Sequence, residues 1–147
     1  MVEYEAYTGE EARRTGELLA ACSLVFEEFA PPYLTDRLPR ITDPALVAAR
    51  FADGSLAGFK LGYRRGASLF YSWLGGVHPR ARRQGIAREL TLRQHELARR
   101  QGYEFIETRT RAQNVAMLIL NLQAGFRVCG FEVDRGGHEV VSFRKPL

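Results

Sequence analysis

The sequence is poor in cysteine, in lysine and in long hydrophobic runs, and the shortages of cysteine and of long hydrophobic runs each exclude a class of protein. Its only cysteines, Cys22 and Cys129, are too few and too far apart for a disulfide framework or a metal-binding knuckle. No apolar run reaches the roughly 18 residues of a membrane-spanning helix, and no signal-peptide pattern is present. These shortages predict a cytoplasmic protein with free thiols, no metal site and no membrane association.

The scarcity of lysine leaves arginine to supply nearly all of the positive charge. Lys60 and Lys145 are the only lysines, whereas the formal net charge is +4. Arginine matches the bidentate geometry of a phosphate. A basic chain favours anionic ligands, whether a nucleotide cofactor or a nucleic acid, so charge by itself leaves both kinds of ligand open.

The remaining composition is that of one soluble domain. The chain has 147 residues, of which 46% are hydrophobic and 26% charged, and no repeat or low-complexity tract interrupts it. These values are typical of a globular protein that is large enough to bury a core. We therefore expect a single domain over residues 1–147.

The N-terminal third predicts a strand, a helix and an irregular connection. Residues alternate in polarity from Val2 to Tyr7, and Glu10 and Glu11 then suit the first turn of a helix. We expect this helix to run toward Phe29. The segment from Phe26 to Pro44 combines aromatic, acidic and proline residues, so it forms either a wall of the substrate site or a packed surface loop with solvated acids.

Three strand patterns follow, separated by signals for tight turns. The strands are predicted from Ala45 to Ala52, from Ser55 to Tyr63 and from Ala67 to Val77. Asp53-Gly54 is the strongest short hairpin signal in the chain, and Arg64-Arg65-Gly66 supplies the second turn. Sequential strands joined by tight turns form an antiparallel meander.

From Ile86 the hydrophobic period changes to that of a helix, which ends at Gly102. The pattern from Tyr103 to Thr110 predicts another strand. A strand, a helix and a strand in this order predict that the two strands pair in parallel through a right-handed crossover.

A second helix and a hairpin complete the chain. Asn114 is the expected N-cap of a helix from Val115 to Gln123. The strands from Phe126 to Val133 and from Glu139 to Phe143 form the hairpin. The predicted fold class is α/β (α+β), one domain with a mixed central sheet of about six or seven strands and about four helices.

The stretch from Leu74 to Leu90 carries the first chemical motif. A Gly pair, a proline and three arginines precede a helix N-terminus, and a fourth arginine, Arg88, lies in its first turn; free N–H groups and the helix dipole there can hold an anion such as phosphate. Residues Arg82 to Ala87 have the form R-x-x-G-x-A. The stretch contains neither a P-loop nor a G-x-G-x-x-G sequence, and a solvated basic connection is the alternative interpretation.

A second motif, from Asn114 to Phe126, lies one helix and one strand further along. It has the form N-x-x-[AM]-x-x-L-[YN]-x-x-x-G-F. The pair of motifs, in this order and on these elements, resembles the GNAT (GCN5-related N-acetyltransferase) superfamily, in which Val77-His78-Pro79 followed by R-x-x-G-x-A looks like the acetyl-CoA signature. The resemblance implies a GNAT-like fold whose central parallel strands splay apart.

The resemblance also implies that acetyl-CoA binds along this stretch. Its pyrophosphate would lie on backbone N–H groups at the start of the helix, where the small residues Gly85 and Ala87 permit a close approach. Its pantetheine would pair with the edge from Gly75 to Val77, and the Gly pair is consistent with a bulge there. The implied cofactor-binding residues are Gly75, Gly76, Val77, Arg82, Arg83, Gln84, Gly85, Ile86, Ala87, Arg88, Asn114, Met117 and Asn121.

The chemistry that the resemblance implies is direct attack of an amine on the thioester within a ternary complex. This reaction needs a neutral amine, a hydrogen-bond donor for the oxyanion and a proton for the leaving thiolate. The backbone N–H of Gly76 or of Val77 is the candidate oxyanion donor.

The sequence leaves open which residues act as the catalytic acid and as the general base. Asn121 stands where many GNAT members carry a tyrosine, and asparagine can donate a hydrogen bond to sulfur but supplies no proton at neutral pH. Water, CoA itself or Tyr71 would then protonate the thiolate. The candidate general bases are Glu107, Glu27 and Glu28, each of which could instead be a solvated surface acid.

We therefore predict an acetyl-CoA-dependent N-acetyltransferase that acts on a primary amine of a small molecule or peptide. The alternatives are the use of another acyl-CoA, a CoA-binding protein with weak or no activity, and a basic nucleic-acid-binding module. Against the last, the arginines between Arg80 and Arg100 alternate with helix-core residues, and no aromatic-basic stripe accompanies them. The last strands could also pair two copies of the chain into a homodimer.

Overall fold

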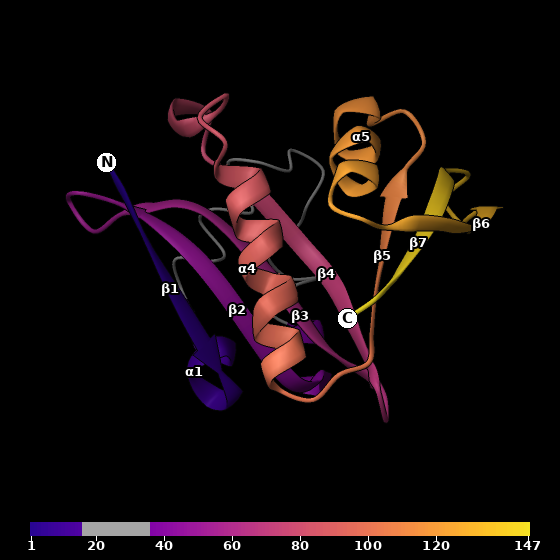
Figure 1. Ribbon diagram of the computed structural model, residues 1–147, viewed down its shortest axis with the longest axis horizontal. Helices are drawn as coiled ribbons and strands as arrows, with labels where there is room; N and C mark the ends of the chain where they lie inside the picture. Colours follow the sequence, from indigo (N-terminus) through magenta and orange to yellow (C-terminus); the bar gives the residue numbers. More distant parts are fainter. Residues whose placement is uncertain (16–35) are drawn as a thin grey trace.

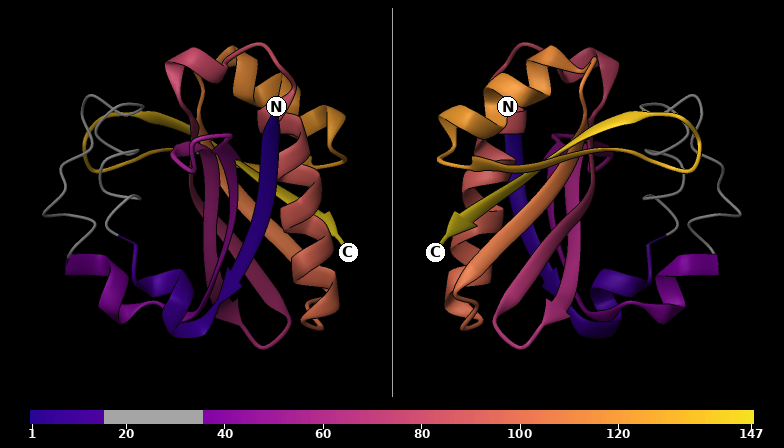
Figure 2. Two further views of the ribbon diagram at one scale, coloured as in Figure 1. Left: turned by 90° about the vertical axis from the view of Figure 1, so that its left-hand side faces the viewer. Right: turned by 90° about the vertical axis from the view of Figure 1, so that its right-hand side faces the viewer.

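The computed structural model describes residues 1–15 and 36–147, which form a seven-stranded sheet with helices on both faces (Figure 1). The strands lie in the order β1-β2-β3-β4-β5-β7-β6. Figure 2 shows α4 and α5 on one face of the sheet and α1 on the other. The strands are β1 (Val2–Thr8), β2 (Thr42–Phe51), β3 (Leu56–Gly66), β4 (Leu69–Val77), β5 (Phe105–Arg111), β6 (Arg127–Val133) and β7 (Glu139–Pro146). The helices are α1 (Gly9–Arg13), α4 (Ile86–Arg100) and α5 (Val115–Gln123), with 3₁₀ turns η1 (Leu38–Arg40) and η2 (Pro79–Ala81).

The predicted α/β class and mixed sheet are confirmed. The pairs β1–β2, β2–β3, β3–β4, β5–β7 and β6–β7 are antiparallel, and β4–β5 is parallel. The order of the last strands was not predicted, because β7 rather than β6 pairs with β5. Of the predicted N-terminal helix, α1 ends at Arg13, and the expectations for Phe26, Glu27 and Glu28 lie outside the described residues.

The meander of β2, β3 and β4 is confirmed, but its second turn was misplaced. Asp53 accepts a hydrogen bond from the backbone N–H of Ser55 at 2.9 Å, as the predicted hairpin turn requires. The prediction of a turn over residues 64–66 is wrong, since β3 continues to Gly66 and the turn lies at residues 67–68. The basic stretch stays within the sheet because Arg64 pairs in register with Thr42 of β2 and Phe70 of β4. Its side chain adds an exposed ion pair with Asp43 (Nε–Oδ2, 2.7 Å).

Strand β2 also begins earlier than expected. It starts at Thr42, whereas the irregular connection was expected to reach Pro44. A register shift between Thr42 and Ala45 accommodates the proline, as a bulge at that position allows.

The parallel pairing that positions the site is short. Strands β4 and β5 pair only over residues 69–72 and 105–108. Beyond Ser72 the two strands diverge (Figure 1), so the predicted splay between the central strands is confirmed, and no strand of the described residues pairs with this edge of β4.

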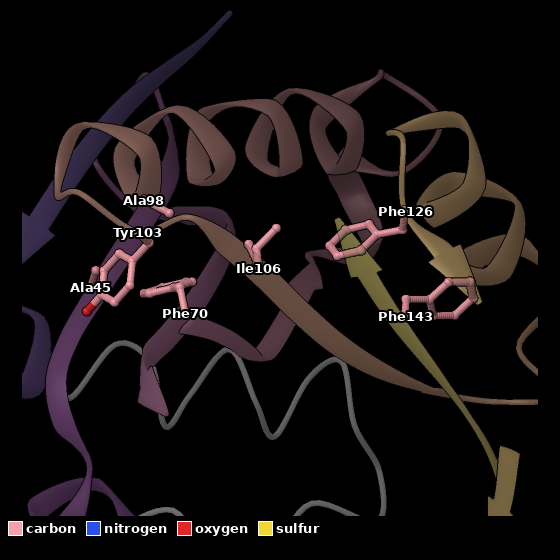
Figure 3. Close-up of a cluster of buried hydrophobic side chains, with 7 residues drawn as sticks. All are labelled: Ala45, Phe70, Ala98, Tyr103, Ile106, Phe126 and Phe143. Atoms are coloured by element: carbon pink, nitrogen blue, oxygen red, sulfur yellow. The ribbon is translucent and has the colours of Figure 1, made fainter. Parts of the chain in front are cut away.

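An apolar core beneath α4 fixes this arrangement (Figure 3). Aromatic rings from β4, β7 and the loops beside them pack with Ile106 of β5, and every side chain drawn in Figure 3 is at most 4% exposed. The members are Ala45, Phe70, Ala98, Tyr103, Ile106, Phe126 and Phe143. Burial of this size anchors the closed end of the splay, because apolar contact area is the main stabilising contribution to folding.

Candidate functional site

The N-terminus of α4 has no side-chain cap. Gly85 occupies the N-cap position with φ +75°, and no side chain accepts a hydrogen bond there. A Cβ added at Gly85 would meet no atom within 4 Å of the described chain. The first N–H groups of a helix have no partner inside the helix, so this end of α4 presents free donors beside open space.

Unpaired arginines surround these donors. Among residues 1–15 and 36–147, Arg83 and Arg88 make no hydrogen bond or ion pair, and both are exposed. Further along the helix, by contrast, Arg99 and Arg100 both pair with Glu96. The free positive charge is therefore concentrated at the N-terminal end of α4 rather than spread as a stripe along the helix.

The unpartnered edge of β4 lies next to this helix end. The backbone N–H of His78 donates to the carbonyl of Ala57 on β3 at 2.7 Å, and N–H directions alternate along an antiparallel strand. The N–H of Gly76 therefore also points to β3, whereas those of Gly75 and Val77 point to the open edge. Of the two candidate oxyanion donors, this geometry favours Val77 over Gly76 and adds Gly75.

The predicted bulge at the Gly pair is wrong. Leu61 pairs with Leu74 but Gly62 pairs with Ser72, so the extra residue in β4 is Trp73. A glycine is favoured at position 75 for a different physical reason. A Cβ there would lie 3.1 Å from Cγ of Lys60, so the glycine makes room for the lysine side chain.

The candidate residues of α5 are largely engaged with protein groups. Asn114 caps its own helix, since its Oδ1 accepts from the N–H of Met117 at 3.3 Å. Asn121 is 1% exposed, and its Nδ2 donates to Oγ1 of Thr110 on β5 at 3.0 Å. Its buried Oδ1 has no partner among the described residues. Met117 is half-buried one turn after the cap.

The two catalytic candidates of the sheet lie together on its opposite face. Tyr71 and Glu107 are register partners, and because Ser72 bonds Gln94 of α4, the adjacent Tyr71 points away from α4. Burial raises the pKa of the Tyr71 hydroxyl, which makes it a poorer acid. Glu107 forms an ion pair with Arg144 (3.0 Å). Glu28, the remaining candidate, lies outside the described residues.

A buried polar group on the α4 face was missed. Lys60 is 9% exposed, and burial lowers the pKa of its ammonium group to about 8. His95 of α4 is 2% exposed, and burial followed by the charges of Lys145 and Lys60 lowers its pKa to about 3. The sequence signal was available: a lysine flanked at two residues on either side by Gly58 and Gly62, in the middle of a strand.

Comparison with known proteins gives the family. Residues 7–126 match the model of the Acetyltransferase (GNAT) family. The chain belongs to the GNAT family. No curated protein matches it, and no helix within the described ranges is long and apolar enough to cross a membrane.

Solved acetyltransferase structures share the fold, including two that match over nearly the whole chain. A Bacillus subtilis acetyltransferase in complex with CoA is 19% identical, with a TM-score of 0.79 and 99% of each chain covered. The Escherichia coli ribosomal-protein-S18-alanine N-acetyltransferase is 14% identical, with a TM-score of 0.79, covering 99% of this chain and 94% of the other. Nourseothricin acetyltransferase is 23% identical with a TM-score of 0.63, and the match covers 70% of this chain and 65% of that one.

Proposed function

We propose that this GNAT protein transfers an acetyl group from acetyl-CoA to a primary amine of a small molecule or peptide. The observation that carries the proposal is the uncapped N-terminus of α4 beside the free edge of β4. A CoA thioester needs both features, because its pyrophosphate is an anion and its pantetheine carries amides that can pair with a strand edge. The structural likeness to a CoA-bound acetyltransferase supports the same donor.

The residues present fit acetyl-CoA. The backbone N–H groups from residue 83 to residue 88 would bind the pyrophosphate, and Arg82, Arg83 and Arg88 would add charge-assisted hydrogen bonds. The free N–H groups of Gly75 and Val77 would bind the pantetheine and the thioester oxygen. When bound, acetyl-CoA supplies an activated acyl group, so the protein needs no nucleophile of its own.

The acceptor amine would approach from the opposite face of the sheet, where Tyr71, Glu107, Tyr63 and Trp73 lie. Tyr63 packs edge-on against Tyr71 and Trp73 at ring-centroid distances of 5.6 Å and 5.8 Å. This wall suits an apolar body, and Glu107 offers a carboxylate that would take the proton of the amine, directly or through water.

A thermal-shift experiment followed by an amine screen tests the proposal. We expect CoA and acetyl-CoA to stabilise the protein, and AMP or duplex DNA to leave the melting temperature unchanged. Release of free CoA in the presence of one class of amine then identifies the acceptor. Absence of any response to acetyl-CoA would overturn the proposal, and stabilisation by DNA would favour the nucleic-acid alternative.

A CoA-binding protein without activity is the second candidate function. It is favoured by the buried Asn121 amide, which bonds Thr110 and carries no transferable proton. Binding of CoA with no CoA release from acetyl-CoA by any amine in the screen would support it.

The homodimer also stays a proposal. β6 is an edge strand whose apolar side chains Val128, Phe131 and Val133 are each about 60% exposed, and an exposed apolar edge favours pairing with another copy. Sedimentation of the wild type and of Phe131→Glu would test it, since the charge should shift a dimer to monomers.

A further inference from the structure

Lys60 lies at the free edge of β4 although it belongs to the neighbouring strand. Its neighbours Phe59 and Leu61 are fully buried in the core on the α1 face, so Lys60 points to the α4 face. It is paired across the sheet with Gly75, and its Cγ and Cε lie 3.1 Å and 3.8 Å from where a Cβ of Gly75 would be. The side chain thus passes over the residue of β4 whose N–H faces the open edge.

The Lys60 ammonium group has no counter-charge within the part of the chain that the structure describes. Within residues 1–15 and 36–147 it makes no hydrogen bond or ion pair. The polar and titratable groups on the same face are Ser72 of β4 and Gln94 and His95 of α4, and His95 in turn senses the charges of Lys60, Lys145 and Arg99. All of these groups are neutral or cationic, so no anion among them offsets the effect of burial on the pKa of Lys60.

A buried cation without a partner destabilises the folded state, so the presence of Lys60 at this position suggests a function. Strongly desolvated titratable groups are concentrated at functional sites. The proposed reaction needs an acid for the leaving thiolate. Asn121 supplies no proton, and Tyr71 lies on the opposite face with a raised pKa.

We propose that Lys60 is the catalytic acid that protonates the leaving thiolate of CoA. This inference rests on the proposed acetyltransferase function. An amine nitrogen bonds to the thioester carbon, the C–S bond breaks, and the sulfur takes a proton from Nζ of Lys60. The new amide loses the former amine proton to the base or to water, and Lys60 regains a proton from solvent. The net products are the acetylated amine and CoA thiol.

A lysine is suited to this task. Burial brings its pKa to about 8, so most of the group carries its proton at neutral pH while giving it up more readily than an exposed lysine. An acid works best when its pKa is near the working pH.

The first test measures the pKa of Lys60 in the wild-type protein, which requires no turnover. Because the chain has two lysines, labelling with ¹³Cε-lysine gives two lysine signals, and Lys145→Arg assigns them. We expect the Lys60 signal to titrate near pH 8 in the free protein. In the complex with CoA its pKa should rise by at least about one unit above that in the complex with desulfo-CoA, which lacks the sulfur. Equal values in the two complexes would overturn the proposal.

The second test measures turnover of Lys60→Met against Lys145→Arg, which keeps the other cation. Lys60→Met should lower kcat about 10- to 100-fold and change KM for acetyl-CoA little, because only a proton transfer is lost. Its melting temperature should rise, since a desolvated charge is replaced by an apolar chain of similar length. Lys145→Arg should retain kcat.

The outcomes separate this inference from the function on which it rests. Failure of CoA to bind overturns both. Normal acetylation by Lys60→Met overturns the role of Lys60 alone and leaves the acetyltransferase standing. Where Lys60→Met does not fold, Lys60→Gln takes its place. Where no amine is acetylated, the comparison of CoA with desulfo-CoA still decides whether Lys60 contacts the sulfur.

Discussion

The two long helices that cover one face of the sheet begin in opposite ways. At the start of α5, the side chain of Asn114 accepts a hydrogen bond from the helix itself. At the start of α4, Gly85 has no side chain to do so, and its φ of +75° is one that few other residues adopt. Among the described residues, a side chain therefore caps the donors of one helix, and none caps those of the other.

The surroundings of the two helix ends strengthen the contrast. The first turn of α5 is apolar, with Val115 exposed. The first turn of α4 follows Arg82 and Arg83 and includes Arg88, so three guanidinium groups lie near its free donors. A helix N-terminus by itself is a weak anion site, and it is the missing cap together with unpaired arginines that distinguishes α4.

The largest expected effect comes from filling the free end of α4. Gly85→Glu should weaken binding of CoA at least about 100-fold, because a carboxylate would occupy the place of the pyrophosphate and repel it. Titration calorimetry measures the change. Gly102→Glu is the matched control, since Gly102 also has a left-handed φ and open space around it but lies past the other end of α4. Normal CoA affinity of Gly85→Glu would refute the phosphate placement.

Removal of single arginines should have a smaller effect. Arg83→Ala and Arg88→Ala are each expected to weaken CoA binding about tenfold, the loss of one charge-assisted hydrogen bond. Arg100→Ala serves as the control, because Arg100 is also exposed but pairs with Glu96 at the far end of the helix. An equal loss in all three variants would mean that the overall charge, rather than a defined site, holds the anion.

The capped end of α5 should respond in stability rather than in affinity. Asn114→Ala should lower the free energy of unfolding by about 1 kcal/mol, the usual contribution of an N-cap. Urea denaturation measures it, and Asn114→Ser should recover most of the loss because serine also caps. A loss of CoA affinity as large as that of Gly85→Glu would break the contrast between the two helices.

Both helix starts could be predicted from the sequence because their signals are local. Asn114 precedes an apolar run, and Gly85 follows a basic turn, and each residue acts within one turn of its own position. The splay between β4 and β5 was predicted from the family resemblance rather than from the residues themselves.

Other features depend on contacts between distant segments, which a local pattern does not contain. The sequence predicted Arg64 within a turn, whereas in the structure it lies in β3, where its side chain pairs with Asp43 and lies over the ring of Tyr103. The glycine at position 75 was read as a bulge, although its reason is Lys60 on the adjacent strand. The burial of Lys60 itself depends on α4 packing over β3, and the flanking glycines at positions 58 and 62 are its only local signal in the sequence.

The smallest effect on catalysis is expected at the other end of α5. Asn121→Ala should reduce kcat less than about tenfold, because the amide supplies no proton and its donor is committed to Thr110. It should nevertheless lower the free energy of unfolding by about 1–3 kcal/mol, since Thr110 loses a buried partner. Thr110→Val, which removes the same hydrogen bond from β5, is the matched control and should reproduce the loss of stability with normal turnover. A thousandfold loss of kcat in Asn121→Ala alone would make Asn121 part of the catalytic apparatus, as a hydrogen-bond donor to the thioester or the leaving sulfur rather than as an acid.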